Sequence, residues 1–267
     1  MKNLILIKLG GSVITDKKKD SIVREDVIKR LAKEIKNAHT KLGKDTVFTI
    51  GHGAGSFAHV PAKKYKTKEG LINRNSLFGL CVTEDSARKL NAIVIKNFLE
   101  IGLAAFSFSP ASFLYSDAKV CLKSYFDPLK RALQIGVIPV VYGDVIIDKA
   151  IGCTIFSTET ILSIIAQKLQ KDYKIKIIYV TDVDGVYDKN GKTIPLISDK
   201  NFGQIMTGII GAKGADVTGG MLHKVEESLK LAKKTGIETL IINGNTPGNL
   251  KKAILGSKCV ATKISSI

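Results

Sequence analysis

Short apolar runs alternate with segments of helical periodicity along most of this chain, and that alternation favours a parallel β-sheet covered by helices on both faces. The run LILIKL at residues 4–9 has the length and composition of a buried strand. Between Glu25 and Lys41 apolar side chains recur every three or four residues, as in an amphipathic helix, and Gly43 supplies a suitable end. The sequence therefore predicts an α/β fold.

The remaining segments continue this pattern without a fixed-period repeat, a low-complexity tract or a Pro/Ser-rich linker. A turn at Gly143 and Asp144 is expected to begin a short hairpin. Further helices and strands are expected over residues 84–100, 156–170 and 226–234, and over residues 47–50, 176–180 and 239–244. A chain of 267 residues can bury a sizeable core, so we expect one compact domain, residues 1–267.

The cysteines and the apolar segments indicate the compartment. The spacing of the cysteines, with no Cys-x-x-Cys pair, indicates neither a zinc site nor a redox dithiol. They are Cys81, Cys121, Cys153 and Cys259. The apolar run before Lys8 is too short for a signal peptide or a membrane span, and no later uncharged stretch is long enough to span. We expect a soluble, cytoplasmic protein without a membrane span.

The formal net charge of +17 is the one unusual feature of the composition. Such a charge suits nucleic acid, an anionic membrane surface or a phosphorylated substrate as a partner. The lysines are scattered along the chain and their densest runs, residues 17–19 and 63–68, are short. We therefore expect a lysine-rich surface that attracts anionic small molecules, with no specific nucleic acid as a partner.

A first glycine-rich segment, Lys8-Leu9-Gly10-Gly11-Ser12, follows the first predicted strand. Consecutive glycines let backbone N–H groups approach an anion, and Lys8 and Ser12 add a cation and a hydroxyl. Lys17 is close enough in sequence to fold back over the same phosphates. The segment matches neither G-x-x-x-x-G-K-[ST] nor G-x-G-x-x-G, and taken alone an ordinary turn explains it equally well.

A second glycine-rich segment, residues 51–59 (GHGAGSFAH), also follows a predicted strand and leads into a helix. Its small residues are suited to a second anion site at the helix N-terminus. His59 lies one turn into that helix, from where it could donate a hydrogen bond to a phosphate. Phosphoryl transfer needs cations around the moving group, a role that fits Lys8 and Lys17.

Two later segments repeat this logic. TDVDGVYD, residues 181–188, directly follows a buried strand, where open α/β sheets bind ligands. TGGM, residues 218–221, precedes Lys224 by one helical turn and could hold nucleotide phosphates. Each of the two is a weak signal when taken alone.

The order KLGGS, GHGAGSFAH, GD, TDVDGVYD, TGGM and IING resembles the amino acid kinase superfamily over essentially the whole chain. Within it the sequence is similar to isopentenyl phosphate kinases, because KLGGSVIT precedes Lys17 and HGAGSF precedes His59. The resemblance implies an open αβα sandwich with a mainly parallel sheet, a homodimer, and transfer of phosphate from ATP to isopentenyl phosphate with Mg²⁺. It is compatible with an acceptor-binding lobe, residues 1–171, and a nucleotide-binding lobe, residues 172–267.

The resemblance also implies roles for individual residues. Lys17 matches the lysine that stabilises the transition state, and His59 and Lys8 complete the expected catalytic set. Ala54, His59 and Thr158 match positions that hold the acceptor phosphate. The expected ATP-binding residues are Lys8, Gly10, Gly11, Ser12, Gly55, Asp182, Gly220 and Lys224. No residue is assigned to the metal.

The chain departs from the family pattern after the GD turn, where Ser157-Thr158-Glu159 replaces Ser-Gly-Asp. Thr158 still offers a backbone N–H, and Glu159 keeps the orienting carboxylate with one extra methylene. We also expect an apolar slot beyond His59 for an isoprenoid tail, although the same residues would suit a core. Its predicted lining is Leu77, Phe78, Cys81 and Val82.

Two other functions remain open at this level. A kinase of the same fold could act on fosfomycin or another small phosphate or phosphonate and would share His59. A non-catalytic nucleotide-binding or nucleic-acid-binding protein would be expected to lose its lysines and His59, and here they are present.

Overall fold

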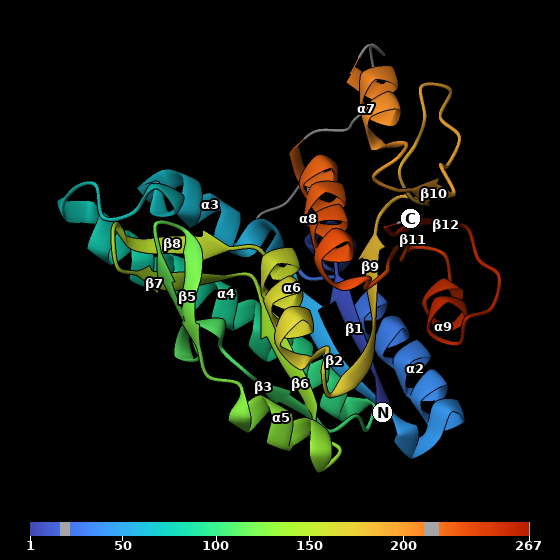
Figure 1. Cartoon of the computed structure of the whole chain (residues 1–267). Coiled ribbons are helices and arrows are strands. Elements are labelled where there is room, and N and C mark those ends of the chain that lie inside the picture. The colour runs from blue at the N-terminus through green and yellow to red at the C-terminus, as the bar shows by residue number, and fades with distance from the viewer. Residues whose placement is uncertain (17–21, 211–218, 267) are drawn as a thin grey trace.

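The structure is a computed structural model that describes residues 1–16, 22–210 and 219–266. Within these residues the main sheet has eight strands in the spatial order β10-β12-β11-β9-β1-β2-β6-β3 (Figure 1). Their bounds are β1 Lys2–Leu9, β2 Thr46–His52, β3 Ala105–Ser107, β6 Ile138–Tyr142, β9 Tyr173–Thr181, β10 Leu196–Ile197, β11 Thr239–Asn243 and β12 Ala261–Ile264. Only the β11–β12 pairing is antiparallel among those described, so the prediction of a mainly parallel sheet is confirmed.

Helices cover both faces of this sheet. Their bounds are α1 Gly11–Ile14, α2 Glu25–Leu42, α3 Gly55–Tyr65, α4 Arg74–Glu100, α5 Asp127–Gln134, α6 Thr158–Leu169, α7 Phe202–Ile210, α8 Gly219–Thr235 and α9 Asn249–Ile254. The 3-10 turns are η1 Gly43–Asp45, η2 Thr67–Glu69 and η3 Pro110–Ser112. Helices α2, α4 and α9 pack on one face and α5, α6 and α8 on the other, which gives the expected αβα sandwich.

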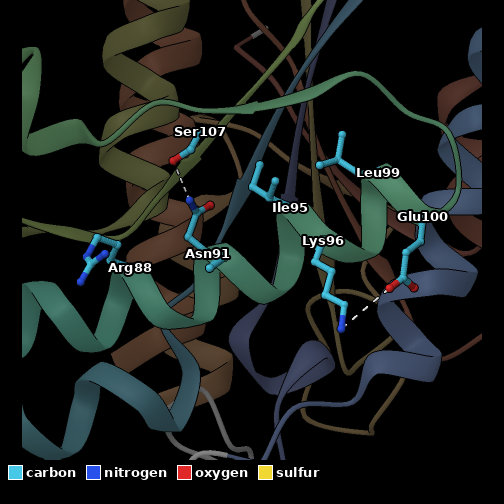
Figure 2. Close-up of a pocket in the computed structure, with 8 residues that line it drawn as sticks. Arg88, Asn91, Ile95, Lys96, Leu99, Glu100 and Ser107 are labelled. Carbon is cyan, nitrogen blue, oxygen red and sulfur yellow. Dashed lines mark hydrogen bonds and ion pairs between the residues drawn. The ribbon is translucent and has the colours of Figure 1, made fainter.

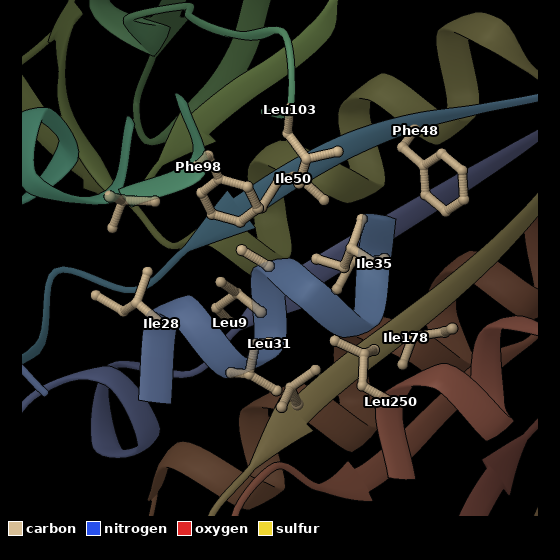
Figure 3. Close-up of a cluster of buried hydrophobic side chains, with 14 of the residues drawn as sticks. Leu9, Ile28, Leu31, Ile35, Phe48, Ile50, Phe98, Leu103, Ile178 and Leu250 are labelled. Atoms are coloured by element: carbon tan, nitrogen blue, oxygen red, sulfur yellow. The ribbon is translucent and has the colours of Figure 1, made fainter. Parts of the chain in front are cut away.

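The central strand β1 shows why both faces need cover. Its alternate side chains point to opposite faces, with Leu4 and Leu6 in one buried cluster and Ile5, Ile7 and Leu9 in the other. In the second cluster Leu9 lies among side chains of α2, including Ile28, Leu31 and Ile35 (Figure 3). A strand buried on both faces is apolar throughout, as LILIKL is.

A smaller sheet of four described strands, in the order β5-β4-β7-β8, lies beside α3 and α4 (Figure 1). The strands are β4 Leu114–Asp117, β5 Val120–Ser124, β7 Asp144–Asp148 and β8 Gly152–Phe156. β7 and β8 form the hairpin expected after Gly143. The sequence pattern did not reveal β4 and β5, because β5 is a short strand with little buried surface.

Three predicted helix starts are wrong: α8 begins at Gly219 and not at the predicted Glu226, and N-cap residues explain the other two. Helix α4 starts at Arg74, ten residues before the predicted start at Glu84, since Asn73 and Ser76 form a capping box. Leu77 and Phe78 are exposed there and obscure the apolar periodicity. The helix predicted from Phe156 starts instead at Thr158, because the Ser157 hydroxyl accepts a hydrogen bond from the Thr160 N–H at 3.1 Å.

The parallel strands bring the predicted motifs together. In the sheet register Leu9 lies opposite both His52 of β2 and Val180 of β9. The segments that follow β1, β2 and β9 therefore leave the sheet at the same edge, where α/β folds bind ligands. None of the helices in the described ranges is long and apolar enough to cross a membrane.

Candidate active site

The two glycine-rich segments contact each other through their backbones. A Cβ on Gly11 would lie 2.7 Å from both Cα and N of Gly55, and a Cβ on Gly53 would lie 2.9 Å from the Gly11 nitrogen. Gly55 also has a φ of +53°, a conformation that favours glycine. The absence of side chains at Gly11, Gly53 and Gly55 thus allows the two loops to lie in contact.

A cluster of three charges, with Lys8 and Glu159 buried and Lys224 partly buried, lies beside these loops. The Lys8 ammonium at the end of β1 donates to Glu159 Oε1, and the Lys224 ammonium lies 3.5 Å from the same oxygen. Burial opposes ionisation of Glu159, but Lys8 and Lys224 more than offset it and lower the pKa of Glu159 to about 2. Burial lowers the pKa of Lys8, with Glu159 opposing and Lys224 adding to the shift. The cluster carries two cations for one carboxylate, which suits an anionic ligand.

Ser12 and Asp182 join the first loop to the segment after β9. The Ser12 hydroxyl donates to Asp182 Oδ1 at 2.8 Å. Gly10 is fixed to the same segment, because its N–H donates to the Val180 carbonyl at 2.8 Å. The structure therefore brings together Ser12 and Asp182, which are 170 residues apart in the chain.

The second loop ends at the N-terminus of α3. Ala54 is the N-cap residue and makes no side-chain capping hydrogen bond, so the helix start is not covered by its own cap. His59 is exposed on the first turns of this helix. The residue is exposed as a whole, but partial desolvation of its ring and then the positive charge of Lys8 lower the pKa of His59, so the imidazole is neutral at pH 7 and can donate one N–H.

Thr158 is the first residue of α6 and is almost fully buried. Its hydroxyl donates to the His52 carbonyl at 2.7 Å and joins α6 to the end of β2. The next residue is Glu159, so one helix N-terminus places both residues that depart from the family pattern. The threonine Cβ fits because the facing residue, Gly51, has no side chain.

The third glycine-rich segment is described only in part. Gly220 lies in the first turn of α8 and its carbonyl accepts from Lys224 Nζ at 2.8 Å. Lys17 and Thr218 lie outside the described residues. The structure therefore does not test the prediction that Lys17 is a catalytic lysine.

Several polar residues of the site were not predicted from the sequence. His52 is buried at the end of β2, and its Nε2 lies 3.1 Å from Oδ1 of Asn91 on α4. His223 on α8 lies with Nε2 3.2 Å from the Ser157 hydroxyl. Asn91 had a detectable signal, since it is a polar residue on the apolar face formed by Ala87, Leu90 and Val94. His223 lies on the exposed side of its helix and had none.

The predicted lining of the apolar slot lies at the start of α4, next to α3. Leu77 and Phe78 are 63% and 64% exposed and Cys81 is also exposed, so these side chains do not belong to the core. Phe78 packs edge-on against Tyr65 near the end of α3, with ring centroids 6.1 Å apart. The surface between α3 and α4 therefore offers apolar side chains on the helices that follow the second loop.

Two glycine loops, a pair of lysines around one carboxylate and the N-terminus of α3 meet at one edge of a parallel sheet, an arrangement suited to phosphoryl transfer by positioned cations. The comparisons with known proteins agree with this class. The model of the amino acid kinase family matches residues 3–243. The chain therefore belongs to the amino acid kinase family.

Individual relatives give a finer comparison. An isopentenyl phosphate kinase of Methanothermobacter thermautotrophicus is 34% identical, with 98% of this chain and 99% of the relative covered. One of Methanocaldococcus jannaschii is 34% identical over 95% of each chain. A crystal structure of an isopentenyl phosphate kinase superposes with a TM-score of 0.81 at 31% identity, covering 98% of this chain and 100% of the other.

Proposed function

We propose that this protein transfers the γ-phosphoryl group of ATP to isopentenyl phosphate and forms ADP and isopentenyl diphosphate. An oxygen of the acceptor phosphate attacks the γ-phosphorus, and the bond from that phosphorus to the β–γ bridging oxygen breaks. The observation that carries the proposal is the position of His59 in the first turns of α3, close enough to the Lys8 cluster for Lys8 to lower its pKa. Full-length similarity to isopentenyl phosphate kinases supports it.

On the donor side, both glycine loops and α8 bind the nucleotide. Lys8 and Lys224 neutralise the developing charge, and Glu159 keeps the two ammonium groups at one point. Lys17 follows the first loop and stabilises the transition state. The proposed ATP contacts are Lys8, Gly10, Gly11, Ser12, Gly55, Asp182, Gly220 and Lys224.

Mg²⁺ fits as an ion that arrives with the nucleotide. In the described part of the chain no group of three or more His, Cys, Asp or Glu side chains could hold a metal, and Glu159 is paired with two lysines. Mg²⁺ commonly keeps several waters and binds phosphate oxygens. When bound, it neutralises charge on the β- and γ-phosphates.

On the acceptor side, Ala54, His59 and Thr158 hold the phosphate of isopentenyl phosphate. His59 donates an N–H from a neutral ring, and the start of α6 contributes the backbone at Thr158. The tail extends between α3 and α4 towards Phe78. In this assignment residues 1–171 form the acceptor-binding lobe and also contribute Lys8 and the glycine loops to the ATP site, and residues 172–267 form the rest of the nucleotide-binding site.

The slot is tested by the size of the side chain at position 78. We expect Phe78→Ala to raise activity with the longer geranyl phosphate relative to isopentenyl phosphate, and Phe78→Leu to have a smaller effect in the same direction. An unchanged preference among acceptors of different length would remove Phe78 from the slot.

The protein also forms a homodimer in our proposal, through a groove between α4 and β3. The groove is lined by apolar and charged side chains including Ile95, Leu99 and Glu100 (Figure 2). β3 is the last strand of the main sheet among the described residues, and Phe106 on it is 59% exposed. An apolar edge strand is a surface on which a second copy can extend the sheet. Leu99→Glu should shift the mass measured by light scattering from dimer to monomer.

One assay tests the proposed activity. ADP release is measured with isopentenyl phosphate, dimethylallyl phosphate, geranyl phosphate and fosfomycin, for the wild type and for His59→Ala. We expect the highest activity with isopentenyl phosphate and at least about a tenfold loss in the variant, which corresponds to about 1.4 kcal/mol. Preference for fosfomycin would reassign the substrate, and equal activity of the two proteins would contradict the role of His59.

Cytoplasmic location is also proposed and is testable by fractionation.

A further inference from the structure

A chain of hydrogen bonds connects the groove of α4 and β3 with the second glycine loop. Asn91 of α4 donates through Nδ2 to the Ser107 hydroxyl at 2.7 Å, as Figure 2 shows. The Oδ1 of Asn91 lies 3.1 Å from Nε2 of His52. His52 is the last residue of β2 and immediately precedes the loop. Asn91 is therefore the only described link between a groove residue and the ring of His52.

The His52 ring is held from several directions. It is fully buried and stacks on Tyr142 of β6 with ring centroids 5.6 Å apart. Its own carbonyl accepts from the Thr158 hydroxyl, and its Nδ1 lies 3.2 Å from the Gly53 carbonyl. Each of these contacts fixes the direction in which the chain leaves β2 towards Gly53.

Asn91 is one of the two oxygen partners of this ring. Burial lowers the pKa of His52, and Lys8 adds to the shift, so the ring is neutral and carries a single N–H. Both ring nitrogens face an oxygen, Nε2 the amide oxygen of Asn91 at 3.1 Å and Nδ1 the Gly53 carbonyl at 3.2 Å, so the single N–H donates to one of these two partners. These contacts fix the orientation of the His52 ring, and with it the backbone position from which residues 53–55 continue.

We propose that Asn91 is a positioning residue for the acceptor: through His52 it holds the loop of residues 53–55 in the conformation that receives the acceptor phosphate. The inference rests on the proposed function, since the acceptor is isopentenyl phosphate. Asn91 contacts neither substrate in this proposal. Its effect reaches them through the backbone of residues 52–55.

The chain offers a matched control for this residue. Asn97 lies on the same helix, is also buried, and also donates through its amide, to Glu25 and to the Ile93 carbonyl. Its described partners belong to α2 and α4. Asn97→Ala therefore removes a buried asparagine from α4 without touching His52.

The first test measures the loop and needs no substrate. Hydrogen–deuterium exchange of the amides of residues 52–59 is compared in the wild type, Asn91→Ala and Asn97→Ala. We expect exchange to quicken by about tenfold or more only in Asn91→Ala, as local opening becomes easier. Asn91→Asp, which keeps an oxygen acceptor towards Nε2, should restore slow exchange. Equal exchange in Asn91→Ala and Asn97→Ala would overturn the proposal.

The second test measures steady-state kinetics of the same proteins. We expect Asn91→Ala to raise KM for isopentenyl phosphate by about tenfold, which is the change that about 1.4 kcal/mol of lost affinity produces, while KM for ATP changes less than about twofold. Equal changes in KM for isopentenyl phosphate and in KM for ATP would also overturn the proposed role of Asn91. If the wild type does not use isopentenyl phosphate, the proposed function fails, and the exchange result alone decides the role of Asn91.

Discussion

The methyl group of Thr158 occupies the space that a side chain on Gly51 would need. A Cβ on Gly51 would lie 2.6 Å from Thr158 Cγ2 and 3.2 Å from Leu162 Cδ1. Gly51 is in β2, and Thr158 is the first residue of α6. The two positions are thus coupled, and the glycine at position 51 leaves room for the threonine methyl group at position 158.

This coupling predicts a rescue. We expect Gly51→Ala to lower the free energy of unfolding by about 1–3 kcal/mol, as overpacking of a core does. Thr158→Ser removes Cγ2 and keeps the hydroxyl that donates to the His52 carbonyl. In the double variant, Thr158→Ser should offset at least about 0.5 kcal/mol of the loss in free energy of unfolding that Gly51→Ala causes, as measured by urea denaturation. Additive effects would show that the methyl group does not limit the space at position 51.

The contact between the two loops gives a second prediction. Gly11→Ala places a Cβ 2.7 Å from backbone atoms of Gly55, so the loops must separate. We expect activity to fall by about a hundredfold, in the range that a displacement of about 1 Å produces at an active site. The measurement is ADP release at saturating ATP.

Gly203→Ala is the matched control for this substitution. It lies in α7, and a Cβ there would meet none of the described atoms within 4 Å outside its own helix. Its activity should equal that of the wild type. Wild-type activity in Gly11→Ala as well would show that close contact of the loops is dispensable.

These residues also show what the sequence could predict. The glycines of both loops, Lys8 and Ser12 were predictable, since each follows an apolar strand and parallel strands end at one edge of the sheet. The contacts between distant segments could not be predicted from spacing, although the family resemblance implied that the carboxylate of Glu159 orients the lysines. Nothing in the spacing of residues 8, 159 and 224 indicates that their charges meet, because only the tertiary packing of α6 and α8 brings them to β1.

The fold was predicted in its main layers and missed in its smaller sheet. Strands β1 and β9 are buried on both faces and read as apolar runs, so they were found. β5 alternates weakly and is largely exposed, and it is held by pairing with β4. Strand pairing of this kind depends on neighbours far along the chain, which periodicity cannot report.

Lys8 and His59 give a third prediction, about titration. Burial and the charge of Lys8 both lower the pKa of His59. We therefore expect the His59 ring to titrate below pH 6.5 in the wild type, followed by NMR of the imidazole. Lys8→Met removes the positive charge and should move the pKa upward. Lys44→Met, on the exposed turn η1, should leave it unchanged, and a downward shift in Lys8→Met would contradict the electrostatic cause.

Glu159 gives the last prediction, about stability and pH. Its pKa is held at about 2, below the ordinary value of 4.5, by Lys8 and Lys224. A carboxylate with a lowered pKa stabilises the folded protein above pH 4.5, and this contribution is lost as the pH falls from 4.5 towards 2. Glu159→Gln should lower the free energy of unfolding by about 3–5 kcal/mol at pH 7, because the buried ammonium of Lys8 and the partly buried ammonium of Lys224 lose their counter-charge.

The difference between the two proteins should then shrink on acidification, since Glu159 of the unfolded wild type takes up a proton before the folded one does. Urea denaturation at pH 7, pH 5 and pH 3 measures this directly. Asp172→Asn is the control, because it breaks the half-exposed Lys130–Asp172 ion pair at 3.1 Å and should cost less than about 1 kcal/mol. A difference between wild type and Glu159→Gln that persists undiminished at pH 3 would mean that packing of the side chain, and not its charge, stabilises the cluster.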